Sequence, residues 1–157
     1  MTDDAAIASA MSAAPAPVAS NATILVLGPG GGTRTVRQGT NAFTCIADDP
    51  STPTPDPMCL DRNAMQWLQA LHDHTAPPNV VGVVFVLVGG AEASNTDPDA
   101  QQPVSGAPWV VTGPHLMIVG PAVGSMADYP RSAEPDTSAP YVMWPGTPYE
   151  HVRIPVR

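Results

Sequence analysis

Proline and glycine set the strongest limit on what this chain can fold into. Of its 157 residues, 20 are proline and 13 are glycine. Proline removes a backbone donor and clashes with the preceding helical turn, while glycine weakens helices through its backbone freedom. A helix bundle and a coiled coil are therefore excluded. We expect one domain of short elements joined by turns and loops, since domains usually span about 100 to 200 residues.

The charge of the chain excludes several classes of function. The net charge is -8, and all six basic residues are arginines. A nucleic-acid-binding surface needs a basic stripe, so we expect no nucleic-acid partner. Without lysine, a Schiff base and a Walker A loop are also excluded. No stretch approaches the roughly 20 apolar residues of a membrane helix, so we expect no membrane span.

The two cysteines bear on stability and on compartment. The 13 residues between Cys45 and Cys59 include four prolines and three aspartates, so this loop cannot form regular structure by itself. A disulfide across it would stabilise the fold by about 3 kcal/mol and would require an oxidising compartment. Two free buried thiols in a cytosolic protein are the alternative.

Apolar periodicity predicts two short helices. Asp4 can cap a helix over 4–14, which Pro15 would end, and Asp61 can cap a stronger helix over 61–74. We expect residues 1–20 to form a helical arm.

The rest of the chain, 21–157, is predicted to form a single α+β domain. Its antiparallel or mixed sheet would have about seven or eight strands, with long proline-rich loops around it. The segments at 22–38 and 141–156 indicate hairpins, and the valine-rich run 80–88 is typical of a central strand buried on both faces. Pro155 suggests that the last strand lies at a sheet edge. The strands expected at 109–112 and 115–120 would pair or form one bent strand.

Two histidines are the main candidates for chemistry. His115 and His151 both occur at or beside predicted strands in apolar surroundings. Together with Glu150 they can bind a transition metal, or act as acid and base near neutral pH. Histidines that are hydrogen-bonded to loop carbonyls in a structural network are the alternative.

Aromatic residues near the C-terminus indicate a small-molecule site. Tyr141, Trp144 and Tyr149 can line an apolar cleft together with His115 and His151. The aromatic residues can equally be large packing residues of the core.

Several segments resemble a family of short exported bacterial proteins that combine a GPH strand with a PYVMWxGTPYxH ending. The matching segments in this chain are SAAP, GTNAFTC, DPMCLD, SNTDP, WVVTGPHLMIVG and PYVMWPGTPYEHVRIPV. The resemblance covers nearly the whole chain and implies an export signal in the precursor, but it implies no activity. Arg153 departs from the pattern, which leads us to expect an apolar residue there, and this argues against burial of its face.

These observations lead to three functional hypotheses. The first is a periplasmic or extracellular domain that binds a small molecule or a metal in a pocket formed by the C-terminal hairpin and the long loops. The second is a small enzyme that is metal-dependent or uses His151 as general base, oriented by Glu150 or Asp97. The third is a structural or interaction domain without a pocket.

Overall fold

The structure is a computed structural model, and it describes residues 1–126 and 128–157. The α-helices are α1 (Asp3–Met11), α2 (Ala16–Ala19) and α3 (Arg62–Asp73). The strands are β1 (Thr23–Leu27), β2 (Thr33–Arg37), β3 (Thr44–Ile46), β4 (Met58–Leu60), β5 (Gly82–Val86), β6 (Gly90–Glu92), β7 (Val110–Thr112), β8 (His115–Val119), β9 (Tyr141–Met143) and β10 (His151–Pro155). Two 3-10 turns, η1 (Pro29–Gly31) and η2 (Pro121–Ser125), complete the described elements.

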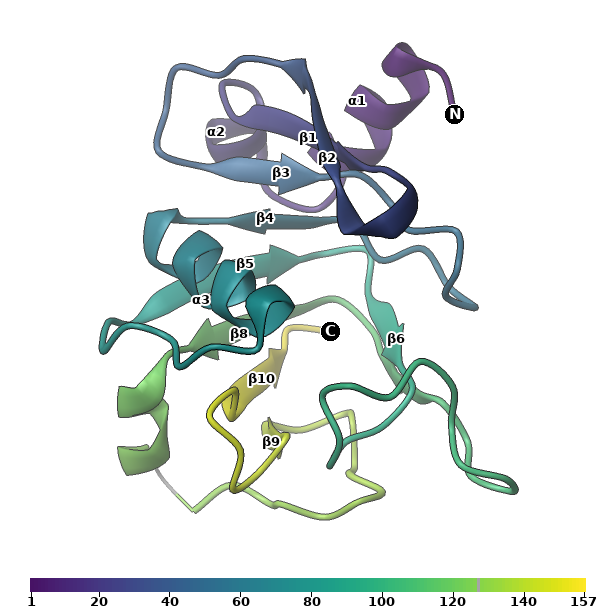
Figure 1. Cartoon of the computed structure of the whole chain (residues 1–157), viewed down its shortest axis with the longest axis vertical. Helices are drawn as coiled ribbons and strands as arrows, with labels where there is room; N and C mark the ends of the chain where they lie inside the picture. Colours follow the sequence, from purple (N-terminus) through teal and green to yellow (C-terminus); the bar gives the residue numbers. More distant parts are fainter. Residues whose placement is uncertain (127) are drawn as a thin grey trace.

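Eight of the strands form one mixed sheet, in the order β2-β1-β3-β4-β5-β8-β10-β9 (Figure 1). β1 and β3 run parallel, and the other pairs of described strands are antiparallel. β6 and β7 form a separate two-stranded sheet. The predicted α+β class, the number of strands and both hairpins are confirmed.

The helix α3 follows its predicted residues closely. Asp61 is its N-cap and accepts a hydrogen bond from the backbone N–H of Ala64 at 2.8 Å. The apolar stripe buries Ala64, Trp67 and Ala70 against the sheet. For α1 the predicted cap is wrong, because Thr2 caps this helix and Asp4 lies inside its first turn.

Three details of the sheet differ from the sequence-based expectations. β5 is central, but Val84 and Val86 are buried while Val83 and Phe85, on its other face, are only half-buried. β7 pairs with β6 instead of with β8.

The third difference concerns β10, which lies between β8 and β9 and not at an edge. Pro155 is tolerated there because the pairing with β9 already ends at Arg153, so no neighbouring strand needs the N–H that proline lacks.

The two faces of the sheet are covered by different helices. α3 covers the face that carries Leu60, Val84 and Met117, while α1 packs its alanines against Ile24 and the two cysteines on the opposite face. The predicted Cys45–Cys59 disulfide is present and joins directly paired residues of β3 and β4. Among the described residues, no helix is long and apolar enough to cross a membrane.

Candidate functional site

β10 brings a buried arginine into the core. Alternation along this strand places His151 and Arg153 on the face covered by α3, while Val152 and Ile154 lie on the opposite face. The side chain of Arg153 is buried, and the residue is only 3% exposed. The expectation that Arg153 argues against burial of this face is therefore wrong.

Two partners hold the Arg153 guanidinium, and one of them, Glu92, neutralises its charge. Its Nη2 donates to Oε1 of Glu92 at 2.9 Å, and its Nε donates to Nε2 of His151 at 3.3 Å. Glu92 reaches it from β6 and stays 36% exposed at its side chain. Among the described residues, Nη1 of Arg153 has no hydrogen-bond partner.

His151 is held as a neutral ring. Its Nδ1 lies 3.0 Å from the backbone carbonyl of Tyr149, so Nδ1 carries the proton and Nε2 is free to accept from Arg153. Burial, and then the positive charge of Arg153, hold the pKa of His151 well below its usual range. The ring packs edge-on against two indoles, with centroids 5.2 Å from Trp67 and 5.0 Å from Trp144.

His115 occupies a separate place on β8. It pairs with Pro155, four residues along β10 from His151, and Arg153 lies between the two positions. Its Nδ1 lies 2.7 Å from the carbonyl of Gly113, and burial lowers its pKa to about 3. Its Nε2 is buried and has no partner among the described residues.

The predicted metal ligands are not brought together. Glu150 accepts hydrogen bonds from Arg131 and from the backbone N–H of Gly146. In the described part of the chain, no group of three or more histidine, cysteine, aspartate or glutamate residues could hold a metal ion. Asp97 is an exposed loop residue whose Oδ1 accepts from the backbone N–H of Asp99.

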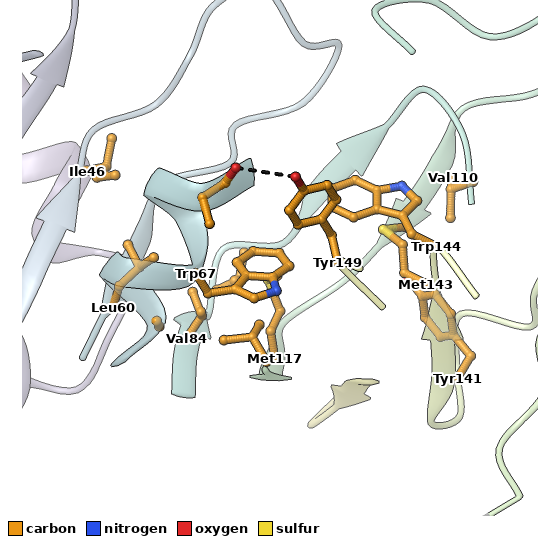
Figure 2. Packing of buried hydrophobic residues seen from close by; sticks show 14 residues of the cluster. Ile46, Leu60, Trp67, Val84, Val110, Met117, Tyr141, Met143, Trp144 and Tyr149 are labelled. Carbon is orange, nitrogen blue, oxygen red and sulfur yellow. Dashed lines mark hydrogen bonds between the residues drawn. The ribbon is translucent and has the colours of Figure 1, made fainter. Parts of the chain in front are cut away.

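The three tryptophans of the chain meet at one cavity of about 250 Å³, which we call the tryptophan cavity. It is lined by Trp67 from α3, by Trp109 from the loop before β7 and by Trp144 after β9. The apolar part of its wall comes from the sheet and includes Leu60, Val84 and Met117. Figure 2 shows Trp67 beside Val84 and Met117 in this cluster.

A few polar groups reach the same cavity. Arg153 and Glu92 line it next to the tryptophans, and Asp49, Ser51 and Gln101 line it from the surrounding loops. The long loop after β6 thus contributes to its wall, as expected of the long loops around the sheet. A mostly apolar cavity with few polar groups is the usual form of a small-ligand site.

Trp144 is held in an uncommon backbone conformation. Its φ is 56°, in the left-handed region that bulky residues rarely adopt. Its backbone N–H donates to Asn95 at 2.8 Å, and its indole N–H donates to the Ser94 carbonyl at 2.9 Å. Backbone strain that the surrounding structure fixes in this way is concentrated at functional sites.

Four of the six segments behind the family resemblance contribute residues to this cavity, while SAAP and GTNAFTC do not. Met58 and Leu60 of DPMCLD, Pro98 of SNTDP and Trp144 of the C-terminal motif all line the tryptophan cavity. His115 of the GPH motif does not line it.

Of the five residues predicted to bind a ligand, Trp144 lines the tryptophan cavity. Tyr141 and Tyr149 are core residues with internal partners. The hydroxyl of Tyr141 lies 2.6 Å from Oγ1 of Thr112, and that of Tyr149 donates to the carbonyl of Thr75 at 2.8 Å. The Tyr149 hydroxyl also donates to the carbonyl of Ala70 at 3.3 Å (Figure 2).

Four residues that line the tryptophan cavity were not predicted as site residues: Trp67, Trp109, Glu92 and Arg153. A signal for Arg153 was present, because an arginine that interrupts an apolar strand pattern needs a partner and is rarely there for packing alone.

A second cavity, of about 480 Å³, adjoins the first and shares Ala93, Ala100 and Trp109 with it. We call it the loop cavity, because the segments 93–111 and 133–137 line it. It is larger, but Arg153 and two of the three tryptophans do not line it.

Comparison of the chain with protein-family models, curated proteins and solved structures finds no match. The resemblance to the exported bacterial proteins therefore stays a prediction.

Proposed function

We propose that this protein is an exported domain that binds a small organic molecule in the tryptophan cavity. The observation that carries the proposal is that all three tryptophans and one buried arginine line a single cavity. Indole rings offer large apolar contact areas, and the Nη1 group of the buried guanidinium, which has no partner among the described residues, can donate to a ligand.

The size of the cavity limits the ligand. Pockets for drug-sized molecules usually have about 300 to 1,000 Å³. A cavity of about 250 Å³ suits a smaller molecule, such as a single substituted ring.

Export is supported by the disulfide and by the family resemblance. The Cys45–Cys59 bond is buried between β3 and β4, and such bonds persist in oxidising compartments. The exported family that the motifs resemble would place the protein outside the cytoplasm.

Nothing in the arrangement favours the acid–base enzyme. Neither His115 nor His151 lines the tryptophan cavity, and the free nitrogen of His151 already accepts from Arg153. A general base must reach its proton within about 3 Å.

A fragment screen by ligand-observed NMR tests the proposal. We expect a subset of small ring compounds to bind wild-type protein and to lose binding in Ala100→Phe, which places a ring at the wall shared by both cavities. Ala107→Phe is the matched control, because Ala107 lines the loop cavity alone. Binding that Ala107→Phe also removes would assign the ligand to the loop cavity, and a screen without any hit would overturn the proposal.

A further inference from the structure

We infer that the tryptophan cavity takes a neutral hydroxylated ring of the pyranose class, held by its ring face on indole and by adjacent hydroxyls on the Arg153–Glu92 pair. This inference rests on the proposed function and specifies its ligand.

The charges at the cavity disfavour an ionic ligand. Arg153 is the one basic residue among those lining it, and Glu92 already neutralises that charge at 2.9 Å. Asp49 adds a second acidic side chain at the wall, and the whole chain carries a net charge of -8. An anion would meet this acidic surplus, while a cation bound to Glu92 would lie beside the guanidinium and compete with it for the same carboxylate. A neutral molecule avoids both costs.

The polar atoms that remain free on the ion pair are one donor and one acceptor. Nη1 of Arg153 and Oε2 of Glu92 have no hydrogen-bond partner among the described residues. A hydroxyl group both donates and accepts. Two neighbouring hydroxyls can therefore satisfy the guanidinium and the carboxylate at once, through charge-assisted hydrogen bonds.

The walls of the cavity suit a ring with an apolar face. Trp67 and Trp144 stack on each other at 12° with centroids 6.3 Å apart and are only 3% and 6% exposed. The accessible indole face is therefore that of Trp109, which is half-buried and lines the cavity from the loop side. A pyranose carries C–H groups on its faces and hydroxyls at its edge. Its faces can contact indole while its edge meets the ion pair and the neutral side chains of Ser51 and Gln101.

Three probes of similar size separate the possible ligand classes. They are a panel of methyl pyranosides, benzoate as the anion and benzyltrimethylammonium as the cation. Tryptophan fluorescence follows the titrations, since every tryptophan of the chain lines the cavity. We expect at least one pyranoside to saturate the signal at millimolar concentration and to bind about tenfold more tightly than either ion.

A single substitution should change this preference. Glu92→Gln removes the charge that neutralises Arg153, so we expect benzoate to gain about tenfold in affinity while the pyranoside loses about tenfold. Glu134→Gln is the matched control, because Glu134 lines only the loop cavity, and it should change neither value. Because Glu92 is 36% exposed, we expect the variant to fold, and its urea midpoint checks this.

Each outcome bears on a different claim. Tighter binding of benzoate or benzyltrimethylammonium by wild-type protein would overturn the pyranose inference, and so would an unchanged preference in folded Glu92→Gln. If no pyranoside binds while other fragments bind and are blocked by Ala100→Phe, the inference fails and the binding function stands. If pyranoside binding survives in Ala100→Phe, the site itself is wrongly placed.

Discussion

The Arg153 guanidinium is held by one partly exposed carboxylate and one neutral imidazole. Arg153→Met leaves Glu92 without its cation, but a side chain that is 36% exposed can recover contact with water. We therefore expect the free energy of unfolding to fall by about 1 to 3 kcal/mol, less than for a fully buried pair. Urea denaturation of both single variants and of Arg153→Met/Glu92→Gln measures the coupling. Strictly additive losses would mean that the pair does not interact.

The two buried histidines should make stability depend on pH. Burial lowers the pKa of His115 to about 3 and that of His151 well below its usual value of about 6.5. In the unfolded chain both rings bind a proton below about pH 6.5, so the native state loses stability as the pH falls from there toward 3. Asp56 acts in the opposite direction, because burial raises its pKa to about 6.

Two histidines outweigh one aspartate, so we expect the free energy of unfolding to decrease between pH 6.5 and 4.5. Each histidine contributes about 1.4 kcal/mol per pH unit. His115→Asn keeps a donor for the Gly113 carbonyl and should make the pH dependence clearly shallower, as urea titrations at several pH values would show. Equal slopes in both proteins would contradict the buried neutral state of His115.

At the residue scale, the polar residues within the last strand can be recognised in the sequence, but their contacts cannot. His151 and Arg153 are two residues apart in β10 and therefore share one face of the strand. Their partners Glu92, Trp67 and Trp144 could not be predicted, because these residues come from distant segments that only the strand order brings together.

Among the elements, α3 depends on Asp61, which both caps the start of the helix and links it to β5. One carboxylate oxygen accepts from the backbone N–H of Ala64 at the start of α3, and the other accepts from the backbone N–H of Val83 in β5 at 2.9 Å. Asp61→Ala should therefore lower the free energy of unfolding in urea by about 2 to 3 kcal/mol, which is more than the loss of an ordinary N-cap. Asp61→Ser can cap the helix but cannot reach both donors, so its loss of unfolding free energy should lie between zero and that of Asp61→Ala.

Thr2 provides the matched comparison for Asp61. It caps the exposed start of α1 through Ala5 at 3.2 Å, so Thr2→Ala should cost about 0.5 to 1 kcal/mol by thermal or urea unfolding. Equal losses at Thr2 and Asp61 would show that the link to Val83 contributes nothing.

The elements also show how far periodicity can predict a fold. Apolar spacing and the capping residue Asp61 were enough to predict α3. Short alternating segments around turns were enough to predict the β1–β2 and β9–β10 hairpins. The parallel pairing of β1 with β3, and the departure of β7 into a second sheet, depend on contacts between distant segments. Local patterns do not encode such contacts.

For the whole molecule, the N-terminal arm acts as a cover over the disulfide. Ala10 of α1 is fully buried, and its carbonyl lies 3.6 Å from Sγ of Cys59. Ala10→Glu would place a carboxylate in this apolar layer, so we expect it to loosen α1 and to accelerate reduction of the disulfide by dithiothreitol at least about tenfold. Ala8→Glu lies on the exposed side of the same helix and should leave the rate unchanged.

The same disulfide should contribute to global stability. Its sequence separation of 14 corresponds to about 3 kcal/mol of reduced unfolded-state entropy. The double variant Cys45→Ala/Cys59→Ala should lose about that amount in urea denaturation. A loss below about 1 kcal/mol would mean that the proline-rich loop is already restricted in the unfolded chain.

The claim that unites these scales is that the three tryptophans form the wall of a ligand site. The most direct measurement is a two-dimensional NMR titration that follows the three indole N–H signals while a hit from the fragment screen is added. We predict that the signals of Trp67, Trp109 and Trp144 shift together along one saturable curve, and that Ala100→Phe abolishes the shifts while Ala107→Phe retains them. Saturable binding that leaves the signals of Trp67 and Trp144 unmoved would contradict the account.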